Sequence, residues 1–118
     1  MDSANPPVDA EKLEELIDLF GDREEVKDLF HEFFNELPSR LSTLRSGLET
    51  NTPSQIDQAA HALKGSSASL GATQVQAAAL ALESDARSEQ LGDAPDHFAL
   101  LEQELEILQK WLTDSGLL

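Results

Sequence analysis

Cysteine is absent from the 118-residue sequence, so the chain can form neither a disulfide framework nor a thiolate metal site. Basic residues are scarce, since 8 Lys and Arg face 23 Asp and Glu and give a formal net charge of −15. This charge would repel a polyphosphate backbone, and nucleic acid is therefore not an expected partner. No apolar run approaches the roughly 18 residues that a membrane span needs, so we expect no membrane partner either.

The N-terminal residues 1–8 lack the basic and apolar regions of a signal peptide. They are polar and contain Pro6 and Pro7, which predicts a short disordered lead before one helical domain at residues 9–118. A chain of this length is large enough for one core and too small for two. Its start at Met1 and its short tail favour a separate small protein, which we expect to be cytoplasmic and monomeric.

The first half of the chain has apolar residues at steps of three and four, a pattern typical of amphipathic helices. A short helix is predicted between Asp9 as its N-cap and Gly21 as its C-terminal stop. A long helix follows from residue 22 to about residue 48. Pro38 interrupts this helix and predicts a kink or a break, and the apolar phase beyond it favours the kink.

The second half predicts three more helices. One begins with Thr52 as its N-cap and Pro53 in its first turn, and it ends near Gly71. The next runs from about Ala72 to a loop at residues 91–95, and the last continues to residues 115–116. Because the connections are short and no segment alternates with period two, we expect an all-α fold. Its expected form is an antiparallel up-and-down four-helix bundle with a short additional N-terminal helix packed across one end.

One surface of the predicted third helix is chemically unusual. Its apolar face is centred near Ile56 and Leu63, and a rotation of about 100° per residue places His61 on the opposite side. An exposed imidazole is a competent nucleophile at physiological pH. Gly65 lies one turn further on, where a glycine costs about 0.5 to 1 kcal/mol relative to alanine. This vacancy would leave room for a phosphoryl group or a docking surface, with Lys64 supplying a positive charge.

A plainer interpretation makes Lys64 and Gly65 the C-cap of this helix, with residues 66–67 opening a loop. Leu63 and Leu70 remain in phase across the stretch, which favours a continuous helix.

The stretch AHALKGSSASLGA at residues 60–72 closely resembles the signature of histidine-containing phosphotransfer (HPt) domains. In that signature a His is followed by Leu two residues on, Lys three on and Gly four on, and a Leu-Gly pair ends the helix. The likeness covers roughly residues 9–115, including the Phe-rich second helix with its Pro and the Leu-Glu and Ala-Arg pairs at residues 82–83 and 86–87. It implies a four-helix bundle in which His61 is phosphorylated and Lys64 and Gly65 are its functional neighbours.

The resemblance also points to two supporting residues. Ser66 falls where many members have a small polar residue near the His, although it would equally fit as an exposed helical serine. Arg87 either faces His61 from the adjacent antiparallel helix or pairs with Glu83 one turn earlier. Glu83 would lie closer to the phosphoryl group, at a position where members often carry an uncharged residue, and its role stays open.

Other candidates for chemistry are weaker. His31 and His97 are interpreted as surface histidines, because neither has a second His three or four residues on to share a metal. No metal site is predicted. The sequence has no Gly-x-Gly, so a nucleotide-cradling loop is not expected.

The sequence therefore predicts a phosphohistidine carrier of a multistep two-component phosphorelay. His61 would accept a phosphoryl group from a receiver-domain aspartate, hold it on Nε2 as the more exposed nitrogen, and pass it to another receiver of a response regulator or hybrid kinase. The chain would need no cofactor of its own, since the receiver should bring Mg²⁺, and it would have no autokinase activity.

Two alternatives belong to other classes. One is a helical adaptor without chemistry, in which the His61 face is only a docking surface, and phosphorylation of His61 separates it from the carrier. The other is a bundle that binds a metal or cofactor inside, which is disfavoured because the inward positions are apolar.

Overall fold

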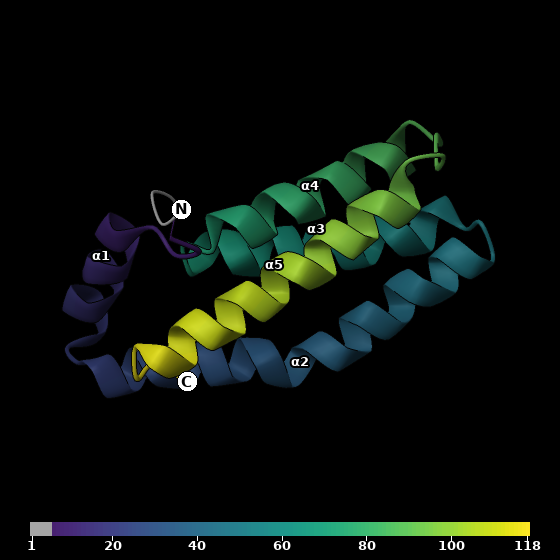
Figure 1. Cartoon of the computed structure of the whole chain (residues 1–118). Coiled ribbons are helices and arrows are strands. Elements are labelled where there is room, and N and C mark those ends of the chain that lie inside the picture. The colour runs from purple at the N-terminus through teal and green to yellow at the C-terminus, as the bar shows by residue number, and fades with distance from the viewer. Residues whose placement is uncertain (1–5) are drawn as a thin grey trace.

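A computed structural model describes residues 6–118 of the chain. These residues form five α-helices and no strand (Figure 1). The helices are α1 (Ala10–Phe20), α2 (Arg23–Glu49), α3 (Pro53–Ser69), α4 (Thr73–Arg87) and α5 (Ala94–Asp114). The all-α class expected from the sequence is thus confirmed.

The first helix begins and ends where the capping residues indicated. The Asp9 side chain accepts a hydrogen bond from the backbone N–H of Glu11 at 3.2 Å. Gly21 ends α1 in a left-handed conformation with φ 92°, and its N–H donates to the carbonyl of Ile17. Asp22 then caps α2 by accepting from the N–H of Glu25 at 2.9 Å.

Helix α2 continues through Pro38 without a break, so the alternative of a break at this residue is wrong. Pro38 is exposed, whereas Leu37 before it and Leu44 after it are buried. A proline inside a helix costs about 3 kcal/mol, and burial of a continuous apolar face on both sides offsets this cost.

The turns between the later helices differ slightly from the expectation. Thr52 and Pro53 open α3 as predicted, but the Thr52 hydroxyl bonds to that of Thr50 at 2.6 Å instead of capping the helix. Gly71 follows α3 with φ 74°. The loop expected at residues 91–95 lies earlier, at residues 88–93, because α4 ends at Arg87 and α5 already begins at Ala94, which is buried.

Residues 1–8 were expected to form a disordered lead. Residues 1–5 of this lead lie outside the described part of the chain. Of its described part, Pro7 and Val8 are buried, and the N–H of Asp9 donates to the carbonyl of Gly71 at 2.8 Å. The packed part of the chain therefore begins before residue 9, and it joins the start of α1 to the turn between α3 and α4.

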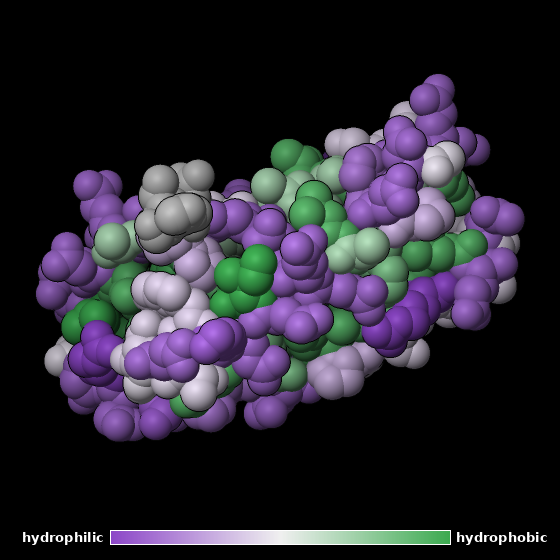
Figure 2. All heavy atoms as spheres, viewed as in Figure 1, coloured by the Kyte–Doolittle hydropathy of each residue, from purple (hydrophilic) through white to green (hydrophobic). Residues whose placement is uncertain are grey.

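Helices α2 to α5 run along the length of the molecule, and α1 lies across one end (Figure 1). The most extensive contact is between α3 and α4, followed by α2 with α3 and α4 with α5, while α1 packs on α2. Fully buried side chains from four helices form the core, among them Phe30, Leu44, Ile56, Leu63, Leu82, Leu101 and Leu108. On the face shown in Figure 2, hydrophilic side chains surround separate apolar patches. None of the described helices is both long and apolar enough to cross a membrane.

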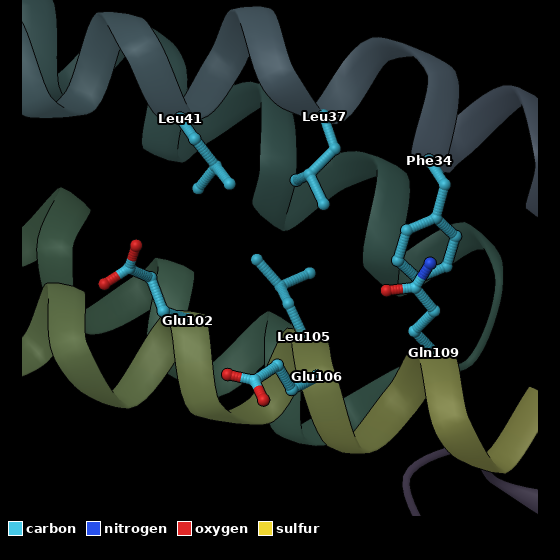
Figure 3. Close-up of a pocket in the computed structure, with 7 residues that line it drawn as sticks. All are labelled: Phe34, Leu37, Leu41, Glu102, Leu105, Glu106 and Gln109. Atoms are coloured by element: carbon cyan, nitrogen blue, oxygen red, sulfur yellow. The ribbon is translucent and has the colours of Figure 1, made fainter.

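A shallow pocket opens between α2 and α5, whose mutual contact is slight. Side chains of both helices point into it, namely Phe34, Leu37, Leu41, Glu102, Leu105, Glu106 and Gln109 (Figure 3). It contains none of the residues to which the sequence assigned chemistry, and those residues lie on α3 and α4.

Candidate functional site

His61 lies on the outer face of α3, as the helical rotation predicted. Its side chain is 63% exposed, whereas Ile56 and Leu63 on the opposite face are buried. The extensive packing of α4 against α3 brings Glu83 beside the imidazole. The imidazole of His61 is thus held on α3 with one side towards solvent and one towards α4.

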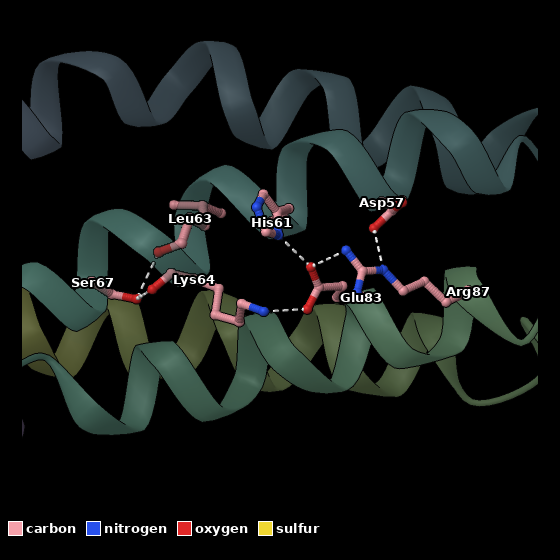
Figure 4. Close-up of polar contacts among 7 residues, drawn as sticks. All are labelled: Asp57, His61, Leu63, Lys64, Ser67, Glu83 and Arg87. Atoms are coloured by element: carbon pink, nitrogen blue, oxygen red, sulfur yellow. Dashed lines mark hydrogen bonds and ion pairs between the residues drawn. The ribbon is translucent and has the colours of Figure 1, made fainter.

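Glu83 is the centre of the site, although its side chain is only 2% exposed. One oxygen, Oε2, lies 2.6 Å from Nδ1 of His61 and 3.0 Å from an Nη of Arg87. The other oxygen, Oε1, accepts a hydrogen bond from Nζ of Lys64 at 2.6 Å (Figure 4). Three nitrogens therefore surround one buried carboxylate.

The surrounding cations keep this carboxylate ionised. Hydrogen bonding from Lys64, above all, holds the pKa of Glu83 below its ordinary value of 4.5. Burial raises this pKa, but the hydrogen bond to His61 and the charge of Arg87 lower it further. A buried carboxylate without such partners would cost several kcal/mol, so the contacts of Lys64 and Arg87 are what permit Glu83 to be charged there.

The ionised state of Glu83 decides which ring nitrogen of His61 carries the proton. An ionised carboxylate can only accept hydrogen bonds, so Nδ1 of His61 must be the donor. In the neutral ring, Nε2 then has the free lone pair. No hydrogen bond joins Nε2 to any residue that the structure describes, and the ring is largely exposed. The nitrogen with nucleophilic character is therefore the accessible one.

The sequence allowed Arg87 either to face His61 or to pair with Glu83, and the structure shows the second arrangement. It pairs with Glu83 one turn earlier, and its Nε also donates to Oδ1 of Asp57 on α3 at 3.2 Å. Because Glu83 itself contacts His61, Arg87 belongs to the same group of side chains. We call Asp57, His61, Lys64, Glu83 and Arg87 together the Glu83 cluster.

Gly65 lies inside α3, four residues before its end at Ser69, so the interpretation of Gly65 as a C-cap is wrong. A Cβ built at Gly65 would meet no atom within 4 Å. The glycine is exposed and its surroundings are open. No packing contact therefore explains why this position has no side chain.

Ser66 takes no part in the Glu83 cluster. It is half-buried and lines a groove between α2 and α3, together with Leu29, Glu32, Phe33, Glu36, Ser69 and Leu70. Neither His61 nor Gly65 lines this groove. The structure thus places Ser66 on the α2 side of α3, away from the contact between His61 and Glu83.

Comparison with known families now bears on this site. The Hpt domain family matches residues 28–111, which include α3, α4 and most of α2 and α5. The chain belongs to the Hpt domain family. As an Hpt domain it has the role of a phosphoryl carrier, rather than a catalyst, in phosphorelays that include receiver domains.

The fold of this Hpt domain also resembles a solved structure, that of histidine-containing phosphotransfer protein B from Pseudomonas aeruginosa PAO1. The TM-score is 0.83, the sequence identity is 24%, and the match covers 94% of this chain and 96% of the other. A comparison with curated proteins gives no match.

The remaining histidines of the Hpt domain have different surroundings. His31 is exposed on α2. His97, expected at the surface, is only 33% exposed and its Nδ1 lies 2.6 Å from Oδ2 of Asp85 on α4. This pair resembles the His61–Glu83 contact but has no lysine or arginine beside it in the described contacts. No group of three or more potential metal ligands occurs among residues 6–118.

The sequence left the role of Glu83 open and did not place it at the centre of the Hpt domain's site. The signal that could have revealed its burial is its position on the helix. Glu83 lies between Leu82 and Ala86 on the buried face of α4, which also carries Ala79. A carboxylate on an otherwise apolar face is buried only when cations meet it there. Lys64 is such a cation, but it comes from another helix.

Proposed function

We propose that this Hpt domain carries a phosphoryl group on Nε2 of His61 between two receiver domains. The observation that supports it most is the exposed ring whose Nδ1 is held by the buried carboxylate of Glu83 at 2.6 Å. This contact turns the lone pair of Nε2 outwards, to where a partner can approach. The resemblance of residues 60–72 to the HPt signature supports the same assignment.

In the accepting step, the lone pair of Nε2 attacks the phosphorus of an aspartyl phosphate on the first receiver. The N–P bond forms as the P–O bond to the aspartate breaks, and that electron pair leaves with the carboxylate. In the donating step, a carboxylate oxygen of the second receiver attacks the phosphorus, and the electron pair of the N–P bond returns to Nε2. Both steps depend mainly on alignment and on charge neutralisation.

The receivers supply the Mg²⁺ and the reacting carboxylates in this proposal. The Hpt domain supplies the rigid imidazole, the open space at Gly65 for close approach and the cations of the Glu83 cluster. It acts as a cytoplasmic monomer without autokinase activity. Ser66 contributes to the surface that the receiver contacts, because it follows Gly65 in the chain and lines a groove between α2 and α3.

We also infer that α2 to α5 form an antiparallel up-and-down bundle. The short connections support this, as do the successive contacts of α2 with α3, α3 with α4 and α4 with α5, together with the contact of α5 with α2. This arrangement keeps the partner-facing surface on two rigid helices.

The experiment is to incubate the protein with a panel of phosphorylated receiver domains and to measure transfer of label. We expect an acid-labile, base-stable phosphoryl label on His61 and its onward transfer to a second receiver. Binding to receivers without any label would overturn the carrier and favour the adaptor.

A further inference from the structure

The pocket between α2 and α5, here called the α2–α5 pocket, is an apolar surface that the bundle leaves open. Leu37 and Leu105 are its most buried lining residues, and Phe34 and Leu41 on its α2 side are half-buried. The side chains of the two helices point towards one another across it (Figure 3). Because α2 and α5 contact each other only slightly, a space of about 210 Å³ remains between them.

The rim of the α2–α5 pocket is acidic. Glu102 and Glu106 line it from α5. Glu102 pairs with Arg45 at 2.9 Å, whereas Glu106 is exposed and has no ion-pair partner among residues 6–118. The whole chain has a net charge of −15, so a second copy of it would be repelled. Charge complementarity instead favours a basic occupant.

The dimensions of the α2–α5 pocket suit one side of a helix. Phe34 and Leu41 on α2 are seven residues apart, as are Glu102 and Gln109 on α5. Each pair therefore spans two helical turns, or about 10 Å. The volume of about 210 Å³ is smaller than the roughly 300 to 1,000 Å³ of small-molecule sites. It fits apolar side chains that a helix lying over the pocket presents at successive turns.

The α2–α5 pocket also lies opposite the candidate phosphoryl site. The helices contact one another in a closed cycle from α2 through α3, α4 and α5 back to α2. The interface of α2 with α5 is therefore on the other side of the bundle from that of α3 with α4, which holds His61 and Glu83. No residue of the Glu83 cluster lines the pocket. An occupant of the pocket would leave His61 accessible.

We propose that the α2–α5 pocket is a docking site for a basic amphipathic helix of a partner protein. Apolar side chains of this helix enter the space between Leu41 and Leu105, and a Lys or Arg beside them pairs with Glu106. The chain thus has a second interaction surface, on which a partner stays bound while the opposite face remains free. This inference goes beyond the proposed function and does not depend on it.

The test is a titration of the ¹⁵N-labelled protein, followed by NMR, with a synthetic helical peptide of about five turns. The peptide has Leu at steps of three and four on one face and Lys elsewhere. We expect the largest changes in amide shifts at residues 34–41 and 102–109. A peptide of the same composition in scrambled order should bind at least about fivefold more weakly. Largest changes on α3 or α4, or equal affinity for the two peptides, would overturn the proposal.

A pair of matched variants separates local charge from net charge. Glu106→Lys reverses the unpaired charge at the rim and should raise the dissociation constant of the helical peptide about tenfold at low salt. Glu15→Lys makes the same change in net charge on the exposed side of α1 and should alter the constant by less than about twofold. If both variants weakened binding equally, the peptide would be attracted by net charge alone and the α2–α5 pocket would not be its site.

Two further measurements distinguish other occupants. A version of the helical peptide with a central Pro cannot form a continuous helix and should bind at least about fivefold more weakly. Equal binding would show that the pocket takes an extended segment. Sedimentation of the free protein over a range of concentrations should show a monomer. A dimer whose formation shifts the amides of residues 34–41 and 102–109 would show that the pocket is an interface between two copies, and would overturn the proposal.

Discussion

Lys64 donates to the buried carboxylate of Glu83 at 2.6 Å, across the contact between α3 and α4. The sequence placed Lys64 beside His61 as a charge for the phosphoryl group. In the structure its first partner is an acid from another helix, and its side chain remains 27% exposed. Lys64 therefore holds Glu83 in the structure, and under the proposed function it also faces the phosphoryl group of loaded His61.

Replacement of Lys64 by Ala should affect both stability and transfer. Glu83 keeps Arg87 and His61 as partners, so we expect a loss of about 1 to 2 kcal/mol in the free energy of unfolding. Phosphotransfer from one fixed receiver should be about threefold to tenfold slower at low salt and less affected at high salt. Urea denaturation and labelled-transfer assays at two salt concentrations measure the two effects.

Lys110→Ala is the matched control for this variant. Lys110 pairs with Asp114 on the surface at 3.0 Å with a side chain 79% exposed, so its loss should change stability by less than about 1 kcal/mol. The double variant Lys64→Ala with Glu83→Gln should regain stability relative to Lys64→Ala alone, because no unpaired buried charge remains. If Lys64→Ala transferred the phosphoryl group at the wild-type rate at low salt, the receiver would supply all the positive charge that neutralises the phosphoryl group.

His61→Gln should abolish acceptance of the phosphoryl group from every receiver. Because the His61 side chain is 63% exposed, the melting temperature should stay within a few degrees of wild type. Circular dichroism and labelled transfer measure the two properties. Label remaining on this variant would move the site to His31 or His97.

Gly65→Gln should slow transfer severely without weakening the fold. The position is helical and open, and glutamine has the better helix propensity by about 0.5 kcal/mol. We expect equal or slightly higher stability in urea and a large fall in the transfer rate, because the new side chain occupies the space beside His61.

Gly71→Ala is a contrasting variant. This glycine has φ 74°, and its Cβ would lie 2.8 Å from Cγ of Lys12, so stability should fall by about 1 kcal/mol or more. Its transfer rate per folded molecule should stay close to wild type. If Gly65→Gln transferred the phosphoryl group at the wild-type rate, the absence of a side chain at Gly65 would not serve docking.

Local signals in the sequence were enough to predict most of the fold. Caps at Asp9 and Gly21 placed the ends of α1, and Thr52 and Pro53 placed the start of α3. The exposure of His61 could also be predicted, because it depends only on the helical rotation within α3.

Contacts between helices could not be predicted in the same way. The Glu83–Lys64 and Asp85–His97 pairs depend on how far one helix is shifted along its neighbour, and apolar packing over the whole interface sets this shift. The burial of Val8 depends likewise on the turn at Gly71, far along the chain. A local pattern carries no information about either.

Acid should weaken the fold through Glu83 in a definite direction. Its pKa in the folded protein lies below the ordinary value of 4.5, chiefly because of the hydrogen bond from Lys64, so the folded state binds this proton less readily than the unfolded chain does. The stability that Glu83 contributes is therefore fully present above about pH 4.5 and is lost as the pH falls through the folded-state pKa.

Glu83→Gln isolates this contribution, because a protonated Glu83 and a glutamine are both neutral and nearly equal in shape. The difference in unfolding free energy between wild type and Glu83→Gln should shrink as the pH falls below about 4.5. Urea denaturation between pH 3 and pH 7 measures it, and Glu106→Gln on the exposed face of α5 supplies the background from general charge. A difference that stays constant down to pH 3 would mean that the carboxylate of Glu83 adds nothing to stability beyond what the neutral side chain provides, and that Lys64 and Arg87 serve the loaded state alone.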